Sequence, residues 1–380
     1  MQILSYHERV AAFFKAKTRL WQYFASPAGS TDPSPVQQEL LKTTYRLSPE
    51  SDPALYAAAH EAAAALGIGQ QITLYQQMDN DALNAAVYTL PDAVHIVFSG
   101  QALKLLSREE LLAVLGHELG HVLLFNQEDY NISNKILNAL SCQPGAGNTY
   151  LETARLFDLY TELFCDSMAL KVTGDSHAAV AALVKMASGL EQVSAAGYIR
   201  QAREIFGQDT VVTGQQTHPE MFIRAYALDL QATDAASWQE QIRPVIEGPA
   251  DLHLLDVFAQ EALAAYTRTC LDQLLRDEAL HTPSLLQLFN EYFPGEKPGH
   301  AGAAEALPPA LSSPACKDYL AYVLADFAFA DKETEEPVLE AAFVLAGTAG
   351  ISNNLAAVLK KELKLSDKQY KERFKKIRMV

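Results

Sequence analysis

Residues 111–125, LLAVLGHELGHVLLF, decide the fold predicted for this chain. Apolar residues surround two histidines and one glutamate, so this segment is expected to form a helix buried in a core. Ser107, with Glu110 three residues later, has the sequence of a capping box and predicts where the helix begins. A second long helix is predicted from about Tyr150 to Lys171, ending at Gly174.

Short strands are predicted just before the central helix. ITLYQQ, NAAVYTL and AVHIVFSG, in the stretch after Gln71, are rich in β-branched and aromatic residues and are separated by the turn-forming DND and LPD. They predict a small antiparallel sheet. Since the remainder of the chain has helical periodicity, the predicted fold class is α+β, mainly helical, with an all-α module at the C-terminus.

Composition excludes several classes of protein. The formal charge of −16 and the pI near 5.1 argue against a dedicated nucleic-acid binder. The four cysteines form no C-x-x-C pair, which favours a reducing compartment. The N-terminal residues lack the unbroken apolar run of a signal peptide, and no later run has the length of a membrane span. We therefore expect a cytoplasmic protein without an integral membrane span.

Four regions are predicted along the chain. They are an N-terminal helical support (1–66), a main domain with a helical extension (67–295), a linker rich in Gly, Pro, Ala and Ser (296–315) and a C-terminal helical module (316–380). The last region ends in a lysine-rich and arginine-rich stretch that is best interpreted as a solvated helix face.

His117 and His121 form the first half of a predicted metal site. Residues four apart on a helix lie on the same face, so the two imidazoles can bind one ion. Glu118 is rotated by about 100 degrees from His117, which suits a base that takes a proton from a metal-activated water better than it suits a ligand. Zinc is the metal that this arrangement favours.

The third ligand is expected from the following helix, which contains YTELFCDSMAL. Glu162 and Asp166 are one turn apart, so Glu162 can bind the metal while Asp166 orients a ligand imidazole. Asp158 and Cys165 are the competing candidates for the third ligand.

Four motifs follow one another along the chain: NAAVYTLPDAVHIVFSGQAL, EELLAVLGHELGHV, ELFCD and THPEMFIR. In this order they resemble the HtpX and CAAX prenyl protease family of zinc metallopeptidases. The resemblance implies a zincin-type (gluzincin) metallopeptidase domain that hydrolyses peptide bonds. It also implies one zinc ion per chain on His117, His121 and Glu162, with Glu118 as the base and Asp166 behind the ligands.

The same resemblance suggests three further roles. His218 would approach the site and stabilise a developing oxyanion, and Arg224 would brace the site through a carboxylate. Asn84 and Ala85 would lie on a sheet edge that binds an extended peptide by strand addition.

One departure from that family affects the expected substrate. Many members have membrane spans, some of them between the two metal-ligand helices, whereas here that interval is NQEDYNISNKILNALSCQPGAGNTY. It is too polar to span a bilayer, so soluble or unfolded polypeptides are the expected substrates.

The C-terminal module is similar to TerB-like helical domains of stress-response proteins, through an apolar helix followed by ADKETEE. Such a module could recruit a protein partner. Two alternatives to an active enzyme follow from the sequence. One is a zinc-stapled scaffold that acts through this module, and the other is a latent enzyme whose linker or loop 208–216 blocks the cleft.

Overall fold

We analysed a computed structural model of the chain, which describes residues 3–26, 34–78, 80–90, 93–142, 147–208, 211–214, 218–299 and 305–375. The described residues form two compact units. Unit 1 comprises residues 1–147 and 153–248, and unit 2 comprises residues 148–152 and 249–380. The predicted linker at 296–315 therefore lies within unit 2, and its residues 300–304 are outside the described residues.

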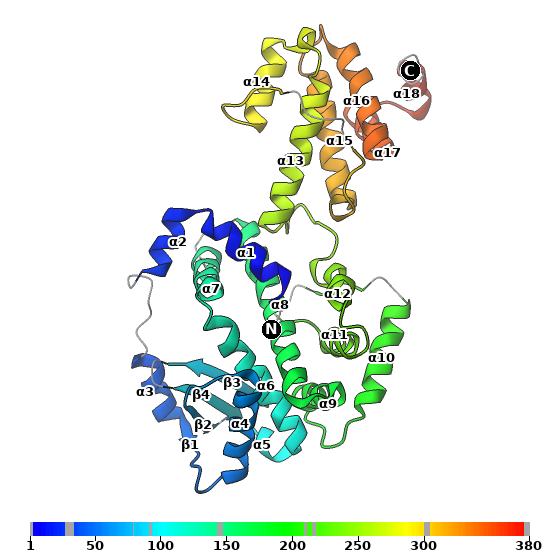
Figure 1. The fold of residues 1–380 in the computed structure, drawn as a ribbon. Coiled ribbons are helices and arrows are strands. Elements are labelled where there is room, and N and C mark those ends of the chain that lie inside the picture. The colour runs from blue at the N-terminus through cyan, green and yellow to red at the C-terminus, as the bar shows by residue number, and fades with distance from the viewer. Residues whose placement is uncertain are drawn as a thin grey trace. The chain divides into compact units, whose positions relative to one another are not determined.

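Unit 1 combines helices with one four-stranded sheet (Figure 1). Its helices are α1 (Ser5–Lys15), α2 (Thr18–Ala25), α3 (Ser34–Thr43), α4 (Pro53–Leu66), α5 (Ala102–Leu105), α6 (Arg108–Phe125), α7 (Glu128–Ser141), α8 (Asn148–Thr173), α9 (Ser176–Ser188), α10 (Ala195–Gln208), α11 (Met221–Thr233) and α12 (Trp238–Glu247). Helix α8 begins among residues grouped with unit 2 and continues through unit 1.

The sheet has the strand order β1-β2-β4-β3 and is mixed. Its strands are β1 (Thr44–Arg46), β2 (Ile72–Gln77), β3 (Asn84–Thr89) and β4 (Val94–Ser99). The prediction of an antiparallel sheet is wrong for one pair, because β2 and β4 are parallel. Every residue of β4 is buried, so this strand takes a central position between β2 and β3, and β3 turns back along its outer side.

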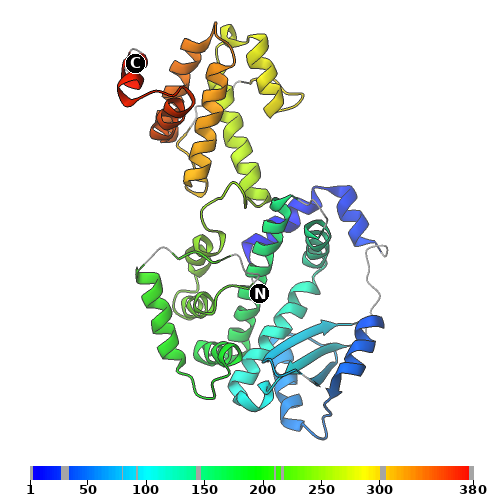
Figure 2. The ribbon, with the colours of Figure 1, turned by 180° about the vertical axis from the view of Figure 1, so that it is seen from behind.

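The two faces of the sheet are covered by different helices. Leu74 and Ile96 are fully buried on one face, where α4 and α6 pack together and against the strands. Tyr75 and Val97, which alternate with them, form a small core with Leu40 of α3 on the other face. Figure 2 shows the sheet from behind, with β3 at its border.

The predicted ends of the two central helices are confirmed. The Ser107 side chain accepts a hydrogen bond from the Glu110 amide, and the Glu110 carboxylate accepts one from the Ser107 amide. Glu110 also receives the ammonium group of Lys185 from α9 at 2.8 Å. Helix α8 ends at Gly174, which adopts a left-handed conformation with φ of 66°.

Two glycines of α6 allow an unusually close approach to α8. A Cβ atom at Gly120 would lie 2.9 Å from the Cα atom of Cys165, and one at Gly116 would lie 3.0 Å from the Cα atom of Ala169. Both glycines lie on one face of α6 because they are four residues apart. Side chains at these positions would force the two helices apart.

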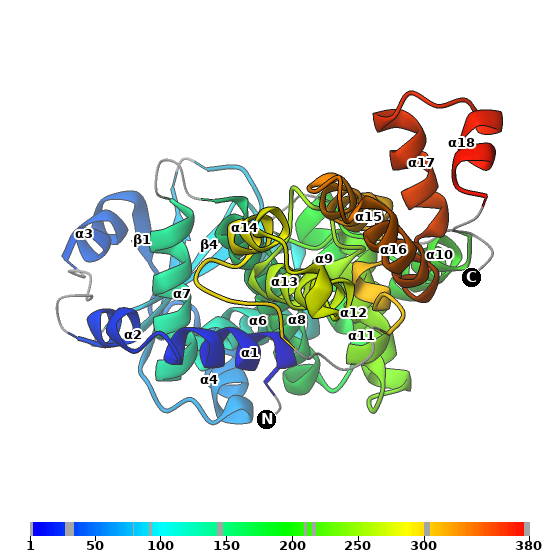
Figure 3. The ribbon, with the colours of Figure 1, turned by 90° about the horizontal axis from the view of Figure 1, so that it is seen from above.

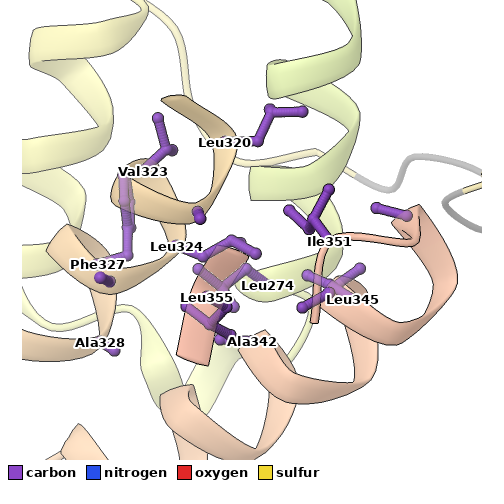
Figure 4. Packing of buried hydrophobic residues seen from close by; sticks show 14 of the residues in the cluster. Leu274, Leu320, Val323, Leu324, Phe327, Ala328, Ala342, Leu345, Ile351 and Leu355 are labelled. Atoms are coloured by element: carbon purple, nitrogen blue, oxygen red, sulfur yellow. The ribbon is translucent and has the colours of Figure 1, made fainter. Parts of the chain in front are cut away.

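Unit 2 is all-helical and has its own core. Its elements are α13 (Val257–Leu274), η2 (Glu278–Leu280), α14 (Pro283–Tyr292), η3 (Pro309–Leu311), α15 (Pro314–Phe329), α16 (Glu335–Ala349), α17 (Ser352–Glu362) and α18 (Asp367–Arg373). Figure 4 shows Leu274 of α13 beside Leu324 of α15, Ala342 of α16 and Leu355 of α17. Helix α13, predicted as part of the main domain's extension, thus shares a core with the C-terminal helices. The lysine-rich end of the chain lies partly outside the described residues.

None of the described helices is long and apolar enough to cross a membrane.

Candidate metal centre

The candidate site lies where α6 and α8 pack together, inside unit 1. His117 and His121 project from the same face of α6, and their rings meet edge to face with centroids 5.2 Å apart. Glu162 of α8 lies opposite them. Its Oε2 atom is 3.5 Å from His117 Nε2, and its Oε1 atom is 3.7 Å from His121 Nε2.

These separations suit a zinc ion. Tetrahedral coordination with bonds of about 2.0–2.1 Å puts neighbouring donor atoms roughly 3.3 Å apart. The Nε2 atoms of His117 and His121 both lie within 3.7 Å of the Glu162 carboxylate, so the three side chains need only small rotations to bind one ion. The residues present fit the metal that the sequence predicts.

Cys165 also belongs to this cluster. Its Sγ atom and the ring nitrogens of His117 and His121 lie within 4.8 Å of one another. The thiol is fully buried beside Gly120, and burial raises its pKa well above the usual value. Of the two competing candidates for the third ligand, the structure thus brings Cys165 to the histidines. Asp158 makes no ion pair with either histidine among the residues described.

Asp166 and Arg224 lie behind the ligands. Asp166 Oδ1 is 3.0 Å from His117 Nδ1 and accepts a hydrogen bond from it, so Nε2 is the ring nitrogen on the side of Glu162. Arg224 of α11 donates two hydrogen bonds to Asp166, at 2.8 and 2.6 Å, and also lies 3.3 Å from Glu162.

Burial and charge set the protonation of this cluster. Burial raises the pKa of Asp166 and Glu162, but Arg224 and His117 outweigh it, so both pKa values are lowered and both carboxylates are ionised. Burial lowers the pKa of His117, but the hydrogen bond to Asp166 and the charge of Glu162 outweigh it and raise that pKa. Burial lowers the pKa of His121 to about 4, so its ring is neutral.

The environment of Glu118 favours its protonated form, unlike those of Glu162 and Asp166. Glu118 is 7% exposed, and burial raises its pKa to about 7, with a further contribution from the charge of Glu162. A carboxylate with a pKa near neutrality exchanges protons readily at physiological pH.

His218 reaches the site from the loop before α11. Its Nε2 atom is 3.7 Å from Glu162 Oε1, and its side chain is 63% exposed. The same loop is held by Glu220, which accepts hydrogen bonds from the Gly214 amide at 2.8 Å and the Thr213 hydroxyl at 2.7 Å. Residues 209–210 and 215–217 of the loop proposed to block the cleft are outside the described residues.

A cavity of about 650 Å³ surrounds these groups. Asn84 and Ala85 line it, together with three further residues of β3, so the edge strand forms one wall. The predicted site residues His117, Glu118, His121, Glu162, Asp166, His218 and Arg224 also line it.

The sequence prediction missed the other walls. They come from α7, with Asn131, Asn134 and Lys135, and from α9, with Ala179, Ala182, Leu183 and Met186. No motif marks these residues, since ordinary side chains become a wall only through tertiary packing.

One comparison with known proteins bears on this arrangement. Residues 49–152 match the model of peptidase family M48. The match points to a metallopeptidase. It covers the sheet from β2 to β4 and all of α6, including His117, Glu118 and His121. It ends before Glu162, and it does not address the HtpX-like subtype or the C-terminal module. No curated protein and no solved structure was found to match the chain.

Proposed function

We propose that this chain is a zinc-dependent endopeptidase that uses Glu118 as a general base. One observation carries the proposal. Two histidine nitrogens and the Glu162 carboxylate converge with spacings that suit a single ion, and a buried glutamate with a raised pKa lies on the same cleft. The family match over α6 supports the same conclusion.

When bound, zinc supplies Lewis acidity that polarises a peptide carbonyl and makes water reactive near neutral pH. The residues of the chain perform the remaining tasks. Glu118 takes a proton from the attacking water and delivers it to the leaving amine. Asp166 holds the His117 ring in one tautomer, and Arg224 keeps the buried carboxylates ionised. His218 donates a hydrogen bond to the oxygen that gains negative charge.

The cleft favours a polypeptide in extended conformation. Strand β3 ends the strand order, and five of its six residues line the cavity. Its outer edge can pair with a substrate strand. Six residues of strand span roughly 20 Å, which is long enough to hold a chain on both sides of the bond that is cleaved. An unfolded polypeptide offers such segments.

The test combines zinc analysis with proteolysis. Wild-type protein is expected to bind one zinc ion and to cleave an unfolded protein such as reduced casein. Glu118→Gln should keep the zinc and lose at least about 100-fold in rate, since general-base catalysis contributes about that much or more. Zinc-free wild type, or unchanged cleavage by Glu118→Gln, would remove the proposal.

Cys165 favours a second candidate, a closed metal site in a non-catalytic scaffold. If its thiolate joined the two histidines and Glu162, four protein ligands would complete the sphere, as structural zinc sites do. Cobalt substitution separates the two cases, because a bound thiolate produces a charge-transfer band in the near ultraviolet. An active enzyme should lack the band and be unaffected by Cys165→Ser. A band that Cys165→Ser abolishes would favour the scaffold.

A further inference from the structure

The cleft extends beyond the metal site toward both ends of α6. Val114, about one turn before His117, and Phe125, about one turn after His121, line the same cavity. Val114 and Phe125 are eleven positions apart on the helix, which corresponds to about 16 Å. Figures 1 and 3 show α6 between α9 and α7, and both of these helices contribute residues to the lining of the cavity.

The α9 arm of the cleft is apolar. It is formed by Ala179, Ala182, Leu183 and Met186, and Val114 of α6 faces the same space. No charged side chain of α9 lines the cavity among the residues described, because Lys185 is directed to Glu110 instead. Such a surface favours a hydrophobic substrate side chain.

The α7 arm is polar and offers hydrogen-bond donors. Asn131 donates to the Phe125 carbonyl at 2.8 Å, which secures the end of α6. The Asn134 side-chain oxygen accepts a hydrogen bond from Asn138 at 3.2 Å, so the amide nitrogen of Asn134 is the group left for a ligand. Lys135 follows directly and lines the same cavity.

Lys135 makes no ion pair in the described part of the chain, although Glu118 and Glu162 line the same cavity. It is partly buried, yet it makes no hydrogen bond there either. Its neighbours three and four positions away on α7 are Asn131, Ile132, Asn138 and Ala139, none of which is acidic. In contrast, the buried Lys185 and Arg224 both contact carboxylates.

The absence of a partner is notable in this composition. The chain has 46 acidic residues and 30 lysines and arginines, so carboxylates are abundant. A partly desolvated ammonium group gains little stability without one. Its place in the cleft, which Asn134 also lines, suits a carboxylate that arrives with a ligand.

We propose that Lys135 and Asn134 form a carboxylate-binding subsite that selects substrates carrying an acidic group a few residues from an apolar one. This inference rests on the proposed peptidase function. Because an extended chain advances about 3.3 Å per residue, the roughly 16 Å over which α6 lines the cavity, from Val114 to Phe125, corresponds to about five residues. The carboxylate can come from an Asp or Glu side chain or from the C-terminus of the substrate.

Peptide cleavage provides the first test. A set of fluorogenic peptides with amidated ends keeps one apolar residue fixed and carries Glu, Gln or Lys at each position within five residues of it. At the best position, wild type should prefer Glu over Gln by about tenfold in kcat/KM, as expected for a charge-assisted hydrogen bond. Lys135→Gln should abolish this preference, and Lys135→Glu should favour the Lys peptide.

Two controls isolate the subsite. Lys171→Glu makes the same charge change on an exposed position of α8 that does not line the cavity, and it should behave as wild type. A second peptide series carries Gln in place of Glu and ends in a free carboxylate at each position in turn. It separates binding of a terminal carboxylate from binding of a side-chain carboxylate. Tryptophan fluorescence confirms that each variant is folded.

Binding provides a readout that does not depend on catalysis. In the Glu118→Gln background, fluorescence anisotropy should show the same tenfold preference for the acidic peptide, and Lys135→Glu should reverse it. Equal binding of Glu and Gln peptides, or a preference that Lys135→Glu leaves unchanged, overturns the subsite even if cleavage requires Glu118. A binding preference without any cleavage by wild type would retain the subsite and refute the peptidase.

Discussion

Replacing Gly120 with alanine should separate the helices that form the candidate metal site. The added Cβ atom would lie 2.9 Å from the Cα atom of Cys165 and 3.2 Å from its sulfur. Comfortable carbon contacts are about 3.5–4.0 Å, so α6 and α8 must move apart by at least roughly 0.6 Å. Overpacking of this kind costs about 1–3 kcal/mol, which exceeds the gain of about 1 kcal/mol from replacing a helical glycine.

Gly207→Ala is the matched control. Gly207 lies near the end of α10 in the same unit, and a Cβ atom there would meet nothing within 4 Å. Alanine should therefore stabilise that position by a few tenths to about 1 kcal/mol. The two variants make the same chemical change and should move the free energy of unfolding in opposite directions.

Urea unfolding followed by tryptophan fluorescence measures both variants. The only two tryptophans, Trp21 and Trp238, belong to unit 1, so the signal reports the unit that contains the site. Zinc affinity, measured by competition with a chelator, should fall on the order of tenfold for Gly120→Ala, because His117 and His121 move relative to Glu162. If Gly120→Ala is as stable as Gly207→Ala, the close approach of α6 and α8 does not constrain the site.

Three further predictions concern buried charge, pH and metal. Arg224→Leu should destabilise unit 1 by about 3–5 kcal/mol in urea unfolding, because Asp166 would stay buried without its partner; a loss below about 1 kcal/mol would contradict this. His7 is fully buried, and burial lowers its pKa to about 3, below the unfolded value near 6.5. Between these two pH values the unfolded chain binds one proton that the folded chain does not. The contribution of His7 to the free energy of unfolding is therefore complete above pH 6.5 and falls by up to about 1.4 kcal/mol per pH unit below it. His7→Gln should show a flatter dependence of stability on pH. Free zinc at 100 times its Kd should stabilise the wild type by about 2.7 kcal/mol in thermal unfolding, whereas His121→Ala should lose nearly all of this effect.

The sequence predicted the parts of the fold that depend on local pattern. The capping box at Ser107 and the end of α8 at Gly174 follow from short-range chemistry, and both are confirmed. The facing of His117 and His121 follows from the helical repeat alone. The location of the candidate metal-binding helix therefore follows from the sequence alone.

Other features depend on packing between distant segments. The parallel pairing of β2 with β4 places the fully buried β4 inside the sheet, and the short edge strand β1 forms in a region predicted as helical because it pairs with β2. The arrangement of Glu162, Cys165 and Asp166 around the histidines is set by the distance between α6 and α8. Spacing along α8 brings all three to one side of the helix and does not decide which of them binds the metal.

The walls of the cleft also differ in mechanical stiffness. Helices α6 and α8 pack closely at the glycines of α6, so the candidate site residues on these helices have little freedom to shift. Strand β3 has a single strand partner, β4, and its residues are only partly buried. Local opening of such a strand requires far less free energy than unfolding of the unit. A rigid wall formed by α6 and α8 and a more easily deformed wall formed by β3 would let substrates of different sequence bind along β3. The bond to be cleaved would then lie in the same position relative to the residues of α6 and α8.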